Sequence, residues 1–254
     1  MWNVQTFTEL PSTQTLARDL LASGSAKHGD VFVALHQSGG RGQYESRTWH
    51  DEPGTNLLLS LVLTDVELSV IDLMQFVTGL SVVSTLRTLL EQRLYHFEND
   101  RIRLKWPNDV LLDGKKICGI LSEASWVGQT LKGLVIGIGL NVNQELFDRT
   151  IAARATSLRN VLGDILKLED IRDLLLTTLQ YTLRAYTDRA KLLGDIRTEL
   201  GWMSNLEHVS AQQPDGNVLE AIRILGINDR GALHISSADG VNMTLDSATL
   251  SYDG

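Results

Sequence analysis

The residues best suited to chemistry begin with a glycine-rich loop, Gly39–Gln43, which follows a predicted strand. Glycines let a backbone approach an anion closely and turn its amides toward it, and Arg41 adds a fixed positive charge suited to phosphate. The spacing is not that of a Walker A loop, and no helix follows directly, as a dinucleotide-binding loop requires. A tight surface turn with a solvated arginine is the competing interpretation.

A second candidate is an extended segment that begins at residue 101 and is closed by Pro107. Because side chains alternate along a strand, its cations share one face and its apolar side chains share the other. Three cations on one face favour an anion site, whereas a solvated edge strand with protective charges explains the pattern equally well. The two faces are Arg101, Arg103 and Lys105 against Ile102, Leu104 and Trp106.

A third pattern lies in the predicted strand Leu134–Asn143, which has one apolar face and one face of glycine and asparagine. Glycine in a strand interior costs conformational entropy and buries nothing, so two on one face need a reason. Such a face suits a flat ligand that lies against the backbone while amides bind its polar edge. A bulge or close packing of the strand on a helix is the alternative. The face consists of Gly137, Gly139, Asn141 and Asn143.

Metal and covalent chemistry have little support in the sequence. The six histidines show no metal-ligand spacing, and a single cysteine, Cys118, excludes an intrachain disulfide and argues against a structural zinc site. Cys118 lies in a predicted buried strand, where a small core residue is expected rather than a nucleophile. No G-x-S-x-G motif is present, so nothing indicates covalent catalysis by the protein.

Composition limits the partners. The chain has 254 residues, enough for a sizeable core, and its net charge of −8 disfavours a nucleic-acid partner. No run reaches about 18 apolar residues, so no membrane span is expected. The first residues have neither a basic start nor an apolar run, so they are not a signal peptide, and a cytoplasmic location follows by default.

The periodicity predicts a mixed α/β layer up to residue 204 and a small antiparallel barrel over residues 205–254. An Asp113-Gly114 turn signals a hairpin within the layer. The predicted helices cover residues 12–23, 69–94 and 168–193. The predicted strands cover residues 1–10, 31–37, 56–63, 101–106, 110–112, 116–123, 134–143, 220–225, 232–236 and 241–245.

Several of these segments together resemble the biotin protein ligase family, in the right order and over nearly the whole chain. The resemblance implies an α/β (α+β) fold: a mixed sheet with packed helices of the biotin/lipoate ligase type, and a C-terminal SH3-like β-barrel. It implies a catalytic biotin- and ATP-binding domain over residues 1–204 and the barrel over residues 205–254. The matching blocks are Ser12–Gln14, Gly40–Gly42, Trp49, Gly54–Leu57, Lys105–Asp109, Gly119–Glu123, Gly137–Asn143 and Gly226–Leu233.

The resemblance also implies a reaction in two steps. Biotin and ATP give biotinyl-5′-AMP and pyrophosphate, and a lysine of a biotin carboxyl carrier domain then attacks the acyl-adenylate. A carboxylate and an α-phosphate are both negative, so cations must offset their repulsion. By similarity, Lys105 bridges the two groups and Arg41 folds over the phosphate. Mg²⁺ is expected on the ATP phosphates.

The remaining roles are likewise carried over by similarity. Trp49 would stack on adenine and Asn141 would bind its edge. The residues implied for biotin are Ser12, Thr13, Gln14, Gln37, Gly40, Arg41, Gly42, Gln43, Lys105, Gly119 and Leu121. Those implied for ATP are Arg41, Trp49, Asn56, Lys105, Asn108 and Asn141.

The sequence departs from the family in the glycine-rich loop, where Gln43 replaces an arginine and Glu45 adds negative charge. The chain has about ten residues before Ser12, so no DNA-binding module fits there, and a ligase without transcriptional activity is expected. Monomer and homodimer both remain open. A lipoate or octanoate ligase of the same superfamily is the first alternative, and a biotin- or nucleotide-binding module without transfer activity is the second.

Overall fold

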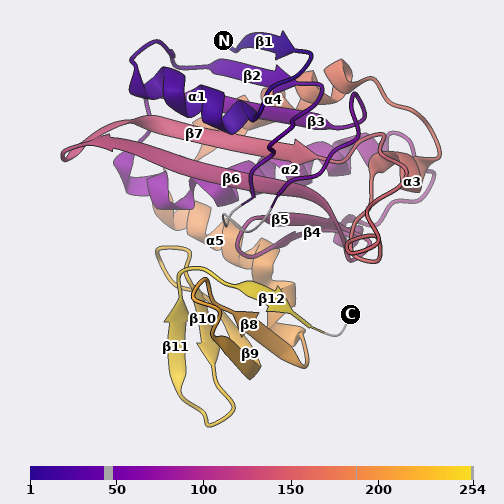
Figure 1. Ribbon diagram of the computed structural model, residues 1–254. Helices are drawn as coiled ribbons and strands as arrows, with labels where there is room; N and C mark the ends of the chain where they lie inside the picture. The colour runs from indigo at the N-terminus through magenta and orange to yellow at the C-terminus, as the bar shows by residue number, and fades with distance from the viewer. Residues whose placement is uncertain (43–47, 187, 253–254) are drawn as a thin grey trace.

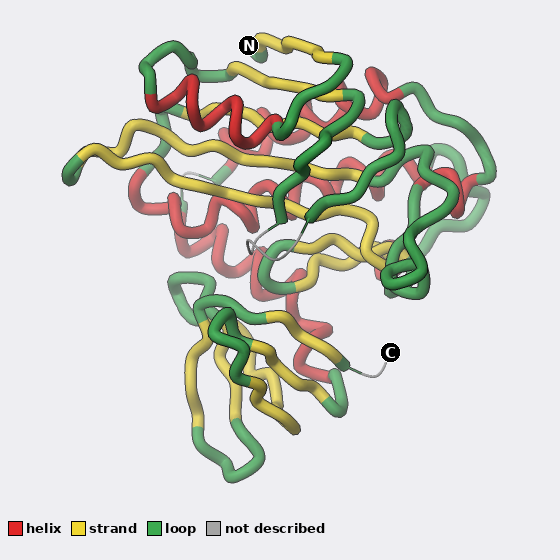
Figure 2. The backbone as a smooth tube through the Cα atoms, in the orientation of Figure 1, coloured by secondary structure: helices red, strands yellow, loops and turns green. Residues whose placement is uncertain are grey.

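The computed structural model of the protein describes residues 1–42, 48–186 and 188–252. A seven-stranded mixed sheet forms the larger part, and a five-stranded antiparallel sheet lies beside it (Figure 1, Figure 2). The predicted fold class, a mixed α/β sheet with packed helices and a small C-terminal β module, is confirmed.

The large sheet has the strand order β1-β2-β3-β7-β6-β5-β4. β1 and β2 are parallel, and the other neighbouring pairs are antiparallel. Every residue of β3 is buried, as expected for an apolar strand covered on both faces. The strands are β1 (Asn3–Phe7), β2 (Asp30–Ala34), β3 (Leu57–Leu63), β4 (Ile102–Lys105), β5 (Asp109–Leu112), β6 (Lys115–Val127) and β7 (Thr130–Leu140).

Helices cover both faces of this sheet. Helix α1 packs on one face, where Ala17 and Leu21 meet Phe32 and Val62, and α2 and α4 lie on the opposite face over the larger core (Figure 1). The face under α1 is only partly covered, and this leaves room for a site. The helices are α1 (Thr13–Ala22), α2 (Met74–Glu91), α3 (Leu158–Leu162), α4 (Leu168–Ala185) and α5 (Arg189–Leu200), with 3₁₀ turns η1 (Leu68–Leu73), η2 (Asn99–Arg101) and η3 (Gly201–Asn205).

The long helix predicted over residues 168–193 is wrong in one respect, because it is two helices. α4 ends at Ala185 and α5 begins at Arg189. The Asp188 carboxylate accepts hydrogen bonds from the amides of Ala190 and Lys191 and so starts the second helix. Apolar periodicity continues across this break and hides it, whereas the capping aspartate is the local signal that reveals it.

The segment Leu68–Glu91 is long and apolar enough to cross a membrane by length and composition, and 61% of its most apolar window is buried inside the protein. This burial is typical of the core helix of a folded domain. Cys118 is fully buried in the core, as predicted, and burial raises the pKa of its thiol far above the ordinary value.

The five-stranded sheet has the order β11-β10-β9-β8-β12, and each neighbouring pair is antiparallel. The sequence analysis missed β8 and β12, which are only four and three residues long. The strands are β8 (Val209–Gln212), β9 (Val218–Ile227), β10 (Leu233–Ser236), β11 (Asn242–Leu245) and β12 (Thr249–Ser251).

Two tryptophans join this small sheet to the large one. The Trp106 indole donates to the Gly231 carbonyl at 2.9 Å, and the Trp202 indole donates to the Leu104 carbonyl at 2.9 Å. The Gly231 backbone is in the left-handed region (φ +79°) and packs on the Phe76 ring. The two sheets therefore share one packed interface.

The three cations of residues 101–105, at the end of η2 and in β4, each contact another group of the protein. Arg101 forms an ion pair with Asp113 at 2.7 Å, and Arg103 lies 5.3 Å from the centre of the Trp202 ring. Lys105 donates to a carbonyl of β12. Because β4 is the edge of the large sheet, the interpretation of these residues as a charged edge strand holds.

Gly231 provides a test of the interface. An alanine Cβ at this position would lie 2.6 Å from the Phe76 ring, whereas one at Gly240, also in the left-handed region (φ +82°), would meet nothing within 4 Å. We expect Gly240→Ala to cost about 1 kcal/mol from the backbone alone. Gly231→Ala should cost about 1–3 kcal/mol more than Gly240→Ala, because its Cβ would overpack the interface. Urea unfolding measures both, and equal losses would contradict the packed interface.

Candidate functional site

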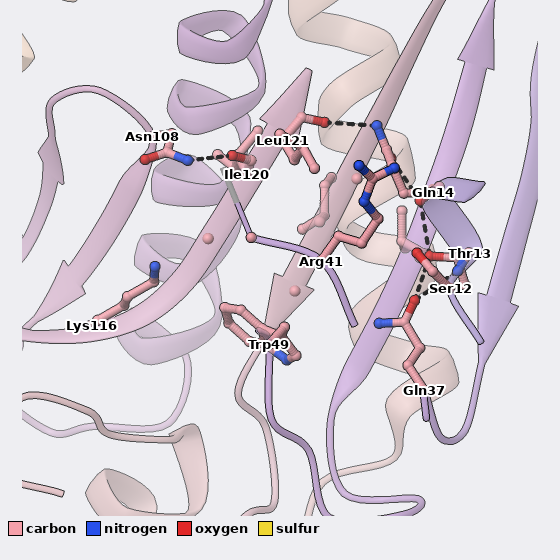
Figure 3. A pocket seen from close by; sticks show the side chains of 17 residues that line it. Ser12, Thr13, Gln14, Gln37, Arg41, Trp49, Asn108, Lys116, Ile120 and Leu121 are labelled. Carbon is pink, nitrogen blue, oxygen red and sulfur yellow. Dashed lines mark hydrogen bonds between the residues drawn. The ribbon is translucent and has the colours of Figure 1, made fainter. Parts of the chain in front are cut away.

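A cleft opens on the sheet face beside α1 (Figure 3). Segments from the whole first half of the chain meet there: the start of α1, the loop after β2, and strands β3, β6 and β7. Its lining residues are Ser12, Thr13, Gln14, Gln37, Arg41, Gly42, Trp49, Leu59, Ser60, Asn108, Lys116, Gly119, Ile120, Leu121, Gly137, Ile138 and Gly139.

One end of the cleft is a wall of hydrogen-bonded polar side chains. The Thr13 amide donates to Gln37 Oε1 at 2.7 Å, and the Thr13 hydroxyl lies 2.9 Å from Ser60 Oγ. Ser60 donates to Gln14 Oε1 at 3.0 Å, and Gln14 Nε2 donates to Glu123 at 2.8 Å. Thr13, Gln14 and Ser60 are almost completely buried. A connected network of this kind holds each donor and acceptor in a fixed direction.

The start of α1 supplies this wall because Ser12 caps the helix. Its side chain accepts a hydrogen bond from the Thr15 amide, so the helix begins at Thr13 and its first turn faces the cleft. Ser12 therefore caps the helix, as expected, and also lines the cleft.

Glycines form the floor of the cleft, as the alternation of β7 predicted. Gly119 of β6 lies opposite Gly139 of β7, and Gly137 lies opposite Ser60. A Cβ at Gly139 would come within 2.7 Å of the Trp49 indole, and one at Gly137 within 2.7 Å of Gln14. The flat group that lies on this glycine face is therefore the protein's own Trp49.

The indole of Trp49 has an unusual environment. Its Nε1 is buried, and among the described residues it has no hydrogen-bond partner. The ring also lies 5.6 Å from Lys116 Nζ, a distance at which a cation is attracted to an aromatic face. The Trp49 ring and the Lys116 ammonium thus close the end of the cleft opposite the polar wall (Figure 3).

Lys116 supplies the positive charge at this end of the cleft, and the sequence analysis did not predict it as a site residue. Its Nζ lies 2.5 Å from Asp109 Oδ1, in an ion pair that lacks the alignment of a hydrogen bond. Strict alternation from Gly119 would turn Lys116 toward the opposite face. A bulge between β5 and β6 lets both Ile117 and Cys118 enter the core and brings Lys116 to the cleft. In the sequence, the only local sign that Lys116 belongs to the site was its position three residues before Gly119.

Arg41 is the second cation at the cleft. It reaches in from the glycine-rich loop and points toward Gln14 (Figure 3). Asn108 also lines the cleft and donates to the Ile120 carbonyl at 2.7 Å. Leu121 lines it as well, and its carbonyl accepts a long bond of 3.4 Å from Gln14.

Four predicted site residues do not line the cleft. Lys105 Nζ donates to the Leu250 carbonyl at 3.1 Å, toward the small sheet. Gly40 lies behind Trp49, where its carbonyl accepts from the Trp49 amide at 3.0 Å. Both are displaced because long-range packing, which no local motif reports, decides their surroundings. Gln43, also predicted, lies outside the described residues.

The two predicted asparagines hold loops instead. Asn56 Nδ2 donates to Gln144 at 2.5 Å, and Asn56 Oδ1 accepts from the Val142 amide at 3.1 Å. Asn141 donates to the Thr156 carbonyl at 3.0 Å. Both asparagines are buried, and their amides are bound to groups of the segment after β7.

Comparison with known proteins assigns the family. Residues 6–141 match the model of the Biotin/lipoate A/B protein ligase family, and the match covers more than half of the chain. The Bifunctional ligase/repressor BirA of Bacillus subtilis (strain 168) is 30% identical over 239 residues, which cover 91% of this chain and 69% of that protein. The chain belongs to the biotin/lipoate A/B protein ligase family and is an enzyme of it.

Other relatives agree with this assignment. The Biotin--[acetyl-CoA-carboxylase] ligase of Mycobacterium tuberculosis is 36% identical over 131 residues, which cover 50% of this chain and 45% of that protein. Among solved structures, the biotin protein ligase from Aquifex aeolicus in complex with biotin and ATP superposes with a TM-score of 0.76 at 24% identity and covers 100% of both chains. This structural likeness is a likeness of fold.

Two buried serine hydroxyls test the polar wall, because Ser60 has hydrogen-bond partners in it and Ser122 has none among the described residues. Ser60→Ala leaves Gln14 Oε1 without the hydroxyl that donates to it and removes one partner of the Thr13 hydroxyl, and we expect a loss of about 1–3 kcal/mol in the free energy of unfolding. Ser122 Oγ is also buried but has no hydrogen-bond partner among the described residues, so Ser122→Ala should be neutral or stabilising. Urea denaturation compares them. A Ser60→Ala loss no larger than that of Ser122→Ala would contradict the network.

Proposed function

We propose that the enzyme is an ATP-dependent biotin protein ligase. It forms biotinyl-5′-AMP from biotin and ATP and then transfers biotin to a lysine of a biotin carboxyl carrier domain. The observation that carries the proposal is the polarity of the cleft. Hydrogen-bonding side chains stand at one end and the Lys116 ammonium at the other, with a glycine floor between them. Biotin has the same order: a ureido ring, an apolar body and a carboxylate.

The polar wall suits the ureido ring, which has two N–H donors and one carbonyl acceptor. Thr13, Ser60 and the two glutamines offer hydroxyl and amide groups in fixed directions. The side chain of Leu121 would contact the thioether ring and the aliphatic tail. A lipoyl or octanoyl chain has no ureido head and would leave these buried groups unpaired, so the wall disfavours the lipoate alternative.

The opposite end suits the reaction. In the first step, a carboxylate oxygen attacks the α-phosphorus of ATP, an anhydride bond forms and pyrophosphate leaves. Both reacting groups are negative, and a fixed cation between them stabilises the transition state. Lys116 takes the bridging role that the resemblance had assigned to Lys105, because Lys116 lines the cleft and Lys105 does not. Arg41 supplies the second positive charge.

Asp109 prepares Lys116 for this task. Its carboxylate holds the ammonium beside the floor of the cleft when no anion is bound. The positive charge of the ammonium attracts a carboxylate and a phosphate. When the ligand carboxylate and the α-phosphate enter, the same ammonium can move from one negative partner to the others without losing its charge.

Fewer contacts in the structure support the proposed binding of ATP. Trp49 lines the cleft with an exposed edge, so stacking of adenine on its ring stays a prediction. The amide of Asn141 already donates to the Thr156 carbonyl, and the expectation that Asn141 binds the adenine edge loses its support. The ATP requirement is supported by the Aquifex aeolicus ligase of the same fold, whose complex contains biotin and ATP.

Mg²⁺ fits the proposal only as a companion of ATP. Among the described residues, no group of three or more histidine, cysteine, aspartate or glutamate side chains could hold a metal ion. Asp109, a carboxylate beside the cleft, is committed to Lys116. The ion would therefore be carried mainly by the phosphate oxygens of the nucleotide.

The second step needs positioning more than chemistry. The carrier lysine, as a neutral amine, attacks the acyl carbon of the adenylate, an amide forms and AMP leaves. The anhydride is already activated, so the cleft has to exclude water that would hydrolyse it. A carboxylase carrier domain as the acceptor is supported by the Mycobacterium tuberculosis relative, whose name specifies acetyl-CoA carboxylase.

The lysines separate this proposal from the alternatives. We expect Lys116→Ala to slow biotin-dependent pyrophosphate release by at least about 100-fold, because the bridging charge is lost. Lys105→Ala should slow it by less than about tenfold, because this lysine acts from outside the cleft. Lys115→Ala, in the neighbouring turn, should stay within about twofold of wild type.

The same assay with a biotin carboxyl carrier domain tests transfer. The intact mass of the carrier should rise by one biotin with the wild-type enzyme, and this gain should disappear with Lys116→Ala. Adenylate formation without any transfer to the carrier would favour the binding-module alternative. A larger loss in Lys105→Ala than in Lys116→Ala would show that the bridging residue is misassigned.

A further inference from the structure

Tyr252 packs against the large sheet at a point next to the cleft. The Lys105 ammonium lies 4.7 Å from the centre of the Tyr252 ring and donates to the carbonyl of Leu250 in β12. The edge of the Tyr252 ring also meets Trp202, with 6.1 Å between the ring centres. Tyr252 is therefore partly buried and held from two sides, although it lies beyond the end of its strand.

Lys105 connects this contact to the ion pair of the cleft. In the antiparallel register of β4 and β5, Lys105 stands directly opposite Asp109. Directly opposed side chains share one face of a sheet, with their Cβ atoms about 5 Å apart. Asp109 in turn forms the ion pair with Lys116. Tyr252, Lys105, Asp109 and Lys116 thus follow one another from the small sheet to the cleft, with Lys105 and Asp109 joined by the strand register.

We infer that Tyr252 is a positioning residue for adenylate formation, acting through Lys105 and Asp109 on the Lys116 ammonium. The inference rests on the proposed role of Lys116. An aspartate between two lysines divides its attraction between them. By holding the Lys105 ammonium toward β12, the Tyr252 ring leaves the Asp109 carboxylate to orient Lys116.

The surroundings of the phenol agree with this placement. Burial, and after it the negative charge of Asp109, raise the pKa of Tyr252. The phenol is thus within electrostatic range of Asp109, the residue that pairs with Lys116.

Steady-state kinetics of biotin-dependent pyrophosphate release tests the inference. We expect Tyr252→Ala to lower kcat by about three- to tenfold and to change the KM for biotin by less than about twofold, because the polar wall that binds the head group is far from this contact. Tyr252→Phe keeps the ring and should restore kcat. Tyr181→Ala, on the exposed side of α4, is the control for loss of a surface tyrosine.

A double mutant tests the route. In a Lys105→Met background, Tyr252→Ala should have no further effect, because the ammonium that the ring holds away from Asp109 is already absent. Additive losses would overturn the inference, and so would a Tyr252→Phe variant as slow as Tyr252→Ala, since the hydroxyl would then be the acting group. If Tyr252→Ala does not fold, as judged by its urea unfolding transition, Tyr252→Phe and Lys105→Met still decide between ring and hydroxyl.

Different results would overturn the positioning role of Tyr252 and the proposed ligase function. An active wild-type enzyme whose kcat is the same in Tyr252→Ala as in Tyr181→Ala would overturn the positioning role alone. A wild-type enzyme that releases no pyrophosphate with biotin and ATP would overturn the proposed function and this inference with it.

Discussion

The register between β6 and β7 is the constraint on which the cleft depends, because it sets Gly119 opposite Gly139. Directly paired residues share a face, so the two glycines form a bare patch of backbone where other pairs would carry side chains. The Trp49 ring fits against that patch at distances that a Cβ would forbid. A slip of one residue would turn the buried Ile138 toward the cleft and close it.

The same row continues from Gly119 to Asp109 and Lys105, and it joins the two sheets of the protein. The first residues of the segment 105–109 contact the small sheet, whereas Asn108 and Asp109 contact the cleft or its lysine. One short segment therefore has two kinds of neighbour. This explains why lysine, tryptophan, asparagine and aspartate occur together there, although only part of the set faces a ligand.

Periodicity in the sequence was sufficient for the layers of the fold and for the glycine floor, because alternation with period two assigns a strand residue to a face. It failed for Lys116, since the bulge at Ile117 inverts the alternation between Gly119 and the turn. It also failed for Lys105, whose partner Leu250 is 145 residues away in the chain. Asn56 and Asn141 look like recognition residues by type, but long-range loop packing uses their amides.

The central claim is that Lys116, and not Lys105, receives the carboxylate of biotin. Titration calorimetry of biotin and of its uncharged amide measures this directly, because the two ligands differ only at that group. The account predicts that the wild-type enzyme and Lys105→Met bind biotin more tightly than the amide, and that Lys116→Met binds both equally. Loss of the preference in Lys105→Met, with the preference kept in Lys116→Met, would contradict the account.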